Sequence, residues 1–234
     1  MIRITGDIHG DPVRFIENNM GDNEWTSEDV LIVCGDFGFV FRNNDSEKEI
    51  LDYLEKEKPY TICFCDGNHE NFPAIYSYPE EEWNGGQIHR IRRNIVHLMR
   101  GQIYEIENKS FFVFGGAYSI DKGWRIEGVS WWPEEQPTEE EYAIGLDNLK
   151  KHNFKVDFII THTAPQAIVE KMIAKQPWNI RSSFEMNYRD YKLMGYLGEV
   201  LYKTEFKHWY FGHWHFDTLI DEKSTAVYYN VYSL

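Results

Sequence analysis

A carboxylate and an imidazole stand two residues apart after a short apolar run near the N-terminus. Residues 2–5 read Ile-Arg-Ile-Thr, and Gly6, Asp7, Ile8 and His9 follow. Because side chains alternate along an extended backbone, Asp7 and His9 are expected to point the same way. A carboxylate and an imidazole together suit a divalent metal ion. The pair therefore predicts part of a metal site.

The same arrangement, an apolar run that ends in residues able to bind a metal, returns four more times. Such runs occupy residues 31–34, 62–65, 158–160 and 209–211. In an open α/β sheet, ligands bind beyond the carboxyl ends of the strands, so the five loops are expected to converge. The candidate metal ligands in these loops are Asp7, His9, Asp36, Asn68, His162, His213 and His215.

The number of candidate ligands favours two metal ions over one. If Asp36 bridges two ions, the seven side chains supply four bonds to each ion and leave room for a shared water. Two ions about 3.5–4 Å apart that clamp an in-line displacement are the recurring arrangement for phosphoryl transfer. A mononuclear structural site would need only four ligands in a closed shell. The pattern thus favours a dinuclear centre.

Five motifs, in this order, make the chain resemble the calcineurin-like metallophosphoesterase family. They span residues 6 to 215 and read Asp7-Ile8-His9, Gly35-Asp36, Gly67-Asn68-His69-Glu70, Thr161-His162 and Gly212-His213-Trp214-His215.

The resemblance implies a role for each position. Asp7, His9 and His215 would hold one ion. Asn68, His162 and His213 would hold the other, with Asp36 between the two. His69 would be the catalytic general acid that protonates the leaving group, and the nucleophile would be a hydroxide that bridges the metals. The cofactors would be two divalent ions, with manganese, iron, zinc and nickel all compatible with nitrogen and oxygen ligands.

The order of the expected elements predicts an α/β/β/α sandwich with the metals at the carboxyl ends of its strands. Strand-like and helix-like segments alternate in the first third, and short strands follow one another between residues 88 and 114. We expect a single domain over residues 1–234. Helices are expected over residues 13–19 with Asp11 as N-cap, over 46–56 opened by Ser46, over 138–152 opened by Thr138, and over 188–202.

Composition limits the classes of partner. The net charge of −14, from 38 acidic and 24 basic residues, opposes an extended nucleic-acid surface, which needs basic side chains against phosphates. No apolar run approaches the length of a membrane span, and we expect a cytoplasmic protein. The three cysteines are too few for a disulfide framework and are interpreted as buried thiols.

The substrate is expected to be a small phosphorylated or nucleotide-type molecule, with a slight preference for a phosphodiester. Protein phosphatases of this family carry an Asp-Arg pair soon after the second motif, whereas here Arg42 comes later. Arg42, Tyr118 and Arg125 are candidate substrate-binding residues. Two alternatives stay open: a phosphomonoesterase, protein phosphatases included, and a non-catalytic metal-binding interaction module on the same fold.

Overall fold

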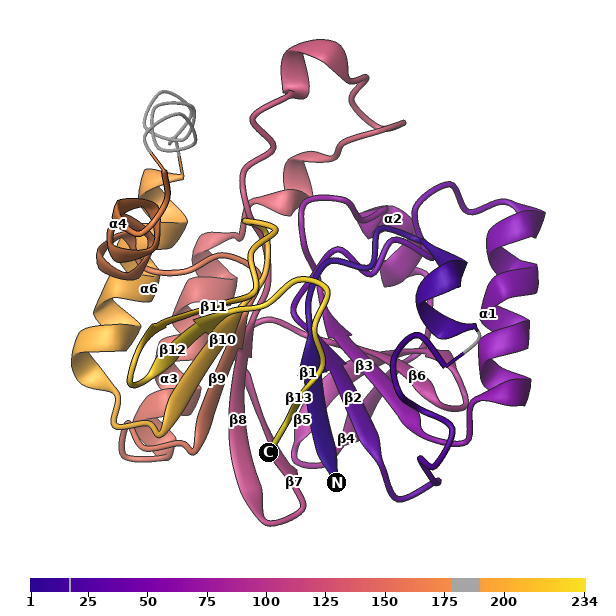
Figure 1. Ribbon diagram of the computed structural model, residues 1–234. Coiled ribbons are helices and arrows are strands. Elements are labelled where there is room, and N and C mark those ends of the chain that lie inside the picture. The colour runs from indigo at the N-terminus through magenta and orange to yellow at the C-terminus, as the bar shows by residue number, and fades with distance from the viewer. Residues whose placement is uncertain (17, 178–189) are drawn as a thin grey trace.

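A computed structural model of the chain describes residues 1–16, 18–177 and 190–234. Two β-sheets pack face to face, and helices cover the outer face of each sheet (Figure 1). This arrangement confirms the α/β/β/α sandwich predicted from the sequence. None of the described helices is both long and apolar enough to cross a membrane.

The first sheet contains seven strands in the order β13-β1-β2-β3-β6-β5-β4. The strands β1, β2, β3 and β6 run parallel, so the loops that follow β1, β2 and β3 leave the sheet at one edge. The bounds of the strands are β1 (Ile2–Thr5), β2 (Val30–Val33), β3 (Thr61–Cys65), β4 (Glu80–Trp83), β5 (Gly86–Arg92), β6 (Ile95–Leu98) and β13 (Tyr232–Ser233).

The second sheet contains six strands in the order β11-β12-β10-β9-β8-β7. Its central strands β8, β9, β10 and β12 are parallel, which again places the loops after β9 and β10 at one edge. The bounds are β7 (Gln102–Ile106), β8 (Lys109–Phe114), β9 (Phe158–Thr161), β10 (His208–Phe211), β11 (Thr218–Asp221) and β12 (Ser224–Ala226).

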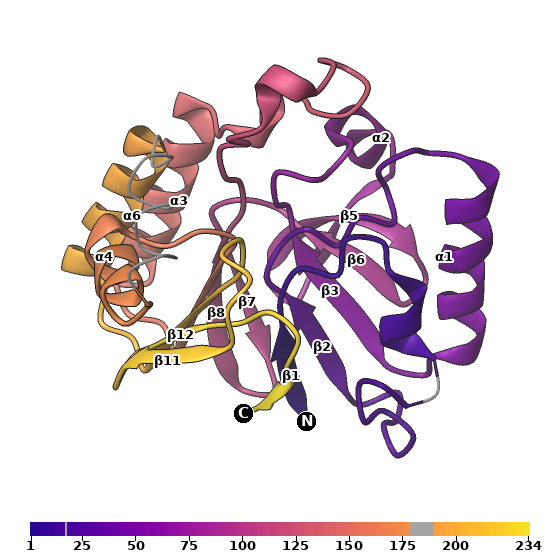
Figure 2. The same cartoon turned by 45° about the horizontal axis from the view of Figure 1, so that its top comes forward.

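Helices cover the two sheets on opposite sides of the molecule (Figure 2). The first sheet is covered by α1 (Asp45–Glu57) and α2 (Phe72–Tyr76). The second is covered by α3 (Glu139–Lys151), α4 (Gln166–Ala174) and α6 (Tyr191–Lys203). Three short 3₁₀ helices lie in loops: η1 (Pro12–Phe15), η2 (Lys122–Trp124) and η3 (Pro133–Glu135).

Strand alternation divides the apolar side chains among three cores. In β2, Ile32 faces the second sheet, whereas Leu31 faces α1. The middle core lies between the sheets and contains Cys34, Cys63 and Cys65, all buried and free, which confirms the interpretation of the cysteines. Because both faces of each sheet are buried, the polar side chains that are expected to bind metal lie at the ends of the strands.

One expected helix differs in type and length, and another differs in its start. Asp11 is an N-cap as expected and accepts a hydrogen bond of 3.0 Å from Val13 N, but the helix that it caps is the short 3₁₀ helix η1 and not an α-helix over residues 13–19. Asn18 adopts φ 60°, outside the helical region. Helix α1 is capped by Asn44, which accepts from Glu47 N, and not by Ser46.

The other two expected helices agree with the structure where it describes them. Thr138 and Glu141 form a reciprocal capping box at the start of α3. Helix α6 covers most of the expected stretch 188–202, of which residues 188 and 189 lie outside the described residues.

Candidate metal centre

The loops after five parallel strands carry the expected ligands to one rim of the sandwich. Asp7, Asp36 and Asn68 follow β1, β2 and β3 of the first sheet. His162 follows β9 and His213 follows β10 of the second sheet. The rim therefore joins side chains from both sheets, and six of the seven expected ligands fall into two groups, with Asp36 between them.

The first group consists of Asp7, His9 and His215, whose ligand atoms all lie within 4.8 Å of one another. The Nε2 atoms of His9 and His215 are 2.9 Å apart, and Nε2 of His215 lies 3.6 Å from Asp7 Oδ1. Two nitrogens bound at right angles to one ion, each about 2.0–2.1 Å from it, would be about 2.9 Å apart. The spacing of these atoms fits a shared cation.

The second group consists of Asn68, His162 and His213. Asn68 Oδ1 lies 3.1 Å from His162 Nε2 and 2.9 Å from His213 Nδ1. His162 Nδ1 lies 2.8 Å from the carbonyl oxygen of Cys34. That contact requires the proton of a neutral ring to be on Nδ1, which leaves Nε2 as an acceptor suited to a metal.

Asp36 lies between the two groups, with one carboxylate oxygen toward each. Oδ2 is 3.7 Å from Nε2 of His9 in the first group, and Oδ1 is 3.4 Å from Nε2 of His162 in the second. Oδ1 also accepts a hydrogen bond of 2.8 Å from the backbone N–H of His69. The two oxygens thus face different sets of ligands.

The charges in the buried centre favour a cation there. Burial alone would raise the pKa of Asp36, but the neighbouring His162 holds it well below its usual range. Burial alone would lower the pKa of His162, but Asp36 and Asp7 outweigh it and raise that pKa to about 10. Without another cation, a proton on His162 offsets the carboxylates. Metal ions would take over that role, so the residues fit the two ions that the sequence predicts.

Backbone strain occurs in the same residues, which make up five of the twelve non-glycine residues with positive φ in the described part of the chain. Five of the seven expected ligands adopt a left-handed backbone, which side chains other than glycine rarely do. Their φ angles are 29° at Asp7, 53° at His9, 50° at Asp36, 68° at His213 and 54° at His215. Such strain persists only where the surrounding structure enforces it, and it gathers at functional sites.

Neighbouring side chains hold the ligands in place. Ser119 Oγ accepts a hydrogen bond of 3.0 Å from Asn68 Nδ2, which turns Asn68 Oδ1 toward the two histidines. Glu70 is fully buried and accepts a hydrogen bond of 2.7 Å from Phe37 N. Glu70 therefore fixes the loop that begins at Asp36, a role that the sequence alone did not resolve.

His69 lies beside the first group and is not one of its three members. Its ring stands edge-on to His9, with centroids 5.0 Å apart, and the guanidinium of Arg125 donates to it, with Nη2 2.6 Å from Nε2. His69, His9 and Asp36 also offer ligand atoms within 4.8 Å of one another. Burial lowers the pKa of His69 to about 4.

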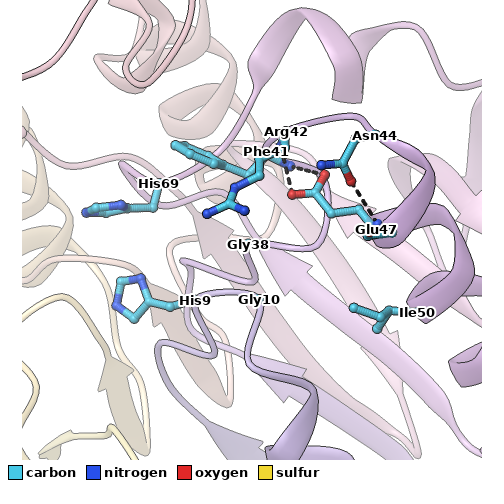
Figure 3. Close-up of a pocket in the computed structure, with 10 residues that line it drawn as sticks. His9, Gly10, Gly38, Phe41, Arg42, Asn44, Glu47, Ile50 and His69 are labelled. Carbon is cyan, nitrogen blue, oxygen red and sulfur yellow. Dashed lines mark hydrogen bonds between the residues drawn. The ribbon is translucent and has the colours of Figure 1, made fainter.

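The three candidate substrate residues differ in position. Arg42 lines a pocket of about 270 Å³ that also includes His9 and His69 (Figure 3). Arg125 contacts His69 directly. The ring of Tyr118 instead lies against the ammonium group of Lys122, 4.1 Å away.

Side chains in two further stretches, residues 131–132 and residues 90–93, have structural partners. Trp132 is buried and packs edge-on against Phe41, with centroids 5.5 Å apart. Arg90 and Arg92 pair with Glu81 and Asp52. These contacts place both stretches in the packing of the protein.

A model of a protein family, described as calcineurin-like phosphoesterase, matches residues 1–217 of the 234. A comparison with curated proteins and a comparison with solved structures found no match.

Proposed function

Because the chain belongs to the calcineurin-like phosphoesterase family, we propose that it hydrolyses a phosphate ester with two divalent ions at the rim of its two sheets. The observation that carries this proposal is the position of Asp36. Its two carboxylate oxygens face His9 and His162, which belong to different ligand groups. A bridging carboxylate requires this arrangement, whereas a single closed metal site does not.

The chain supplies a complete set of donors. Asp7, His9 and His215 would hold one ion, Asn68, His162 and His213 the other, and Asp36 both. When bound, two such ions would lower the pKa of a water between them and neutralise charge on the phosphate, which supplies a nucleophile near neutral pH. Asn68 contributes a neutral ligand, so the centre keeps a positive charge that attracts phosphate even in a chain of net charge −14.

We assign the general-acid role to His69. Its ring is next to His9 but also borders the pocket of Figure 3, so it can reach a leaving group there. Burial keeps the pKa of His69 low in the described state. A phosphate beside the ring would raise that pKa, because an adjacent anion stabilises the imidazolium. His69 would then hold the proton that the departing oxygen needs.

The proposal extends to the kind of phosphate ester that the protein cleaves. No Asp-Arg pair follows Asp36, so we favour a phosphodiester or nucleotide-type substrate over a phosphoprotein. A phosphomonoesterase is the second candidate. A non-catalytic module is disfavoured because the seven donors and His69 all lie together at one rim.

The direct test is hydrolysis of p-nitrophenyl phosphate and bis-p-nitrophenyl phosphate, each with added Mn²⁺ and with a chelator. We expect metal-dependent cleavage, faster on the diester. Faster cleavage of the monoester would show that the protein is a phosphatase and not a phosphodiesterase. If protein with two bound ions cleaved neither ester nor a panel of nucleotides, the catalytic proposal would fail in favour of the binding module.

A further inference from the structure

A pocket extends from the metal centre toward helix α1. His9 and His69 lie at one end of it, and Glu47 and Ile50 of α1 lie at the other (Figure 3). Its floor is formed by Gly10 and Gly38, which pack so closely that a Cβ on Gly10 would be 2.6 Å from the carbonyl oxygen of Gly38. The pocket has a volume of about 270 Å³ and lies beside the candidate metal ligand His9.

Arg42 lies in this pocket without an ion-pair or side-chain hydrogen-bond partner among the described residues. Every other arginine in the described part of the chain donates from its guanidinium to a carboxylate, a carbonyl or a hydroxyl group. These residues are Arg3, Arg14, Arg90, Arg92, Arg93, Arg100 and Arg125. Arg42 is an exposed residue, so its guanidinium can meet a ligand that enters the pocket.

Glu47 is the carboxylate among the residues that line the pocket, and it forms no ion pair with the guanidinium of Arg42. Glu47 accepts hydrogen bonds from the backbone N–H groups of Phe41, Arg42 and Asn43, at 3.1, 2.7 and 2.7 Å. These three donors hold the loop against α1 and occupy the carboxylate. The guanidinium of Arg42 points away from Glu47, into the pocket and toward the end where His9 and His69 lie (Figure 3).

We propose that Arg42 binds a second phosphate group of the substrate, while the metal centre acts on the first. A guanidinium presents a planar fork of donors that matches a phosphate with two parallel hydrogen bonds. Phe41 and Ile50 add apolar walls to the same pocket, which suits a sugar or base attached to the phosphates. The substrate class is thus a nucleotide-type phosphate ester that carries a further phosphate. This inference rests on the proposed function, because it takes the metal centre as the place of the scissile ester.

The test compares ligands that differ by one phosphate. Manganese-loaded protein is titrated calorimetrically with adenosine 5′-monophosphate, adenosine 5′-diphosphate and adenosine 3′,5′-bisphosphate. The same nucleotides are used as inhibitors of bis-p-nitrophenyl phosphate cleavage. We expect at least one two-phosphate ligand to bind about tenfold more tightly than the monophosphate, the size of one charge-assisted contact.

The variants ask whether Arg42 causes that preference. Arg42→Gln should bring the ratio of the dissociation constants close to one, and Arg42→Lys should leave an intermediate ratio because it keeps the charge but loses the fork. The matched control is Arg92→Gln, which removes an arginine of β5 that pairs with Asp52 of α1. This variant should keep the wild-type ratio.

Two results would overturn the inference: a wild-type ratio near one for both two-phosphate ligands, or an Arg42→Gln protein that keeps the wild-type ratio. Failure of the proposed function would be seen separately, as a lack of cleavage of both chromogenic esters. The ratio of the dissociation constants can still be measured by calorimetry in that case. Circular dichroism of each variant confirms that the fold is retained.

Discussion

The ring of Tyr228 lies stacked on the imidazole of His215, with centroids 4.6 Å apart and planes at 18°. Tyr228 belongs to the C-terminal segment that follows the family match, which ends at residue 217. Asp217 fixes this segment by accepting a hydrogen bond of 2.9 Å from Tyr228 N, and Gly6 N donates to the carbonyl oxygen of Tyr228. A segment outside the match thus contacts a candidate ligand of the first group.

Replacing Tyr228 with leucine is expected to weaken metal binding, because His215 loses the ring that limits its rotation. Loss of an outer contact of this kind costs about tenfold or more in metal affinity. Calorimetric titration of the metal-free protein with Mn²⁺ measures the change. Tyr202→Leu, at a tyrosine that is 90% exposed on α6, is the control. Equal affinities for the two variants would show that the stacking does not position His215.

His69→Ala is expected to lower turnover by about 10²–10⁴, the usual contribution of a general acid. Both ions should stay bound, because Asp7, His9, His215 and the second group are unchanged. Steady-state rates and metal analysis on the same preparation separate the two effects. If the ions were lost together with the activity, His69 would be a ligand and its assignment as the acid would be wrong.

Asp36→Asn is expected to lower both metal content and activity. The substitution keeps the shape of the side chain but removes the negative charge that faces His9 and His162. We expect fewer than two ions per chain by elemental analysis, even after incubation with excess Mn²⁺. Retention of two tightly bound ions would exclude the bridging role.

Asp66→Asn is expected to destabilise the fold by up to about 3–5 kcal/mol, because the buried guanidinium of Arg100 loses one of its two carboxylates and keeps only Glu141, 3.2 Å away. Arg100 Nε donates to Asp66 Oδ2 at 2.9 Å, and both side chains are 2% exposed. Urea unfolding at pH 7 measures the loss. A difference below 1 kcal/mol would contradict the view that this pair holds the end of β3.

The same pair predicts a dependence on pH. Burial opposes the charged form of Asp66, but Arg100 and His97 outweigh it and lower the pKa to about 2. A lowered carboxyl pKa contributes stability above the unfolded value of about 3.9, and that contribution is lost as the pH falls toward 2. The gap in stability between wild type and Asp66→Asn should therefore be constant above pH 5 and should narrow below pH 4. A gap that widened on acidification would contradict this sign.

The fold and the convergence of the candidate ligands at one rim were predictable because their signals are local. Each apolar run ends next to its own metal-binding residue, and parallel strands bring their carboxyl ends to one edge. Asp36 and His162 are 126 positions apart in the chain, yet β2 and β9 each deliver one of them to the same rim. The strand pattern was sufficient to place both.

The supporting contacts were not predictable, because they join segments without a shared pattern. The sequence made Tyr118 a candidate substrate residue, but its neighbour Ser119 is the residue that touches Asn68. Nothing in the tail marks Tyr228 as a neighbour of His215. The start of α1 was misplaced for a related reason: Glu47 is held by the amides of residues 41–43, which favours Asn44 as the cap.

The candidate metal centre lies at the rim where the two sheets meet, so bound ions would also link the two layers of the sandwich. The apolar core between the sheets ends below it, and above that core the layers are joined by polar contacts such as the hydrogen bond from His213 N to Asp7 Oδ1. Ions held by Asp36 and His162 would fasten one layer to the other at this edge. When ions occupy the centre, we expect the two halves of the sandwich to unfold together as one cooperative unit. Backbone amide hydrogens near the rim would then exchange with solvent at similar rates.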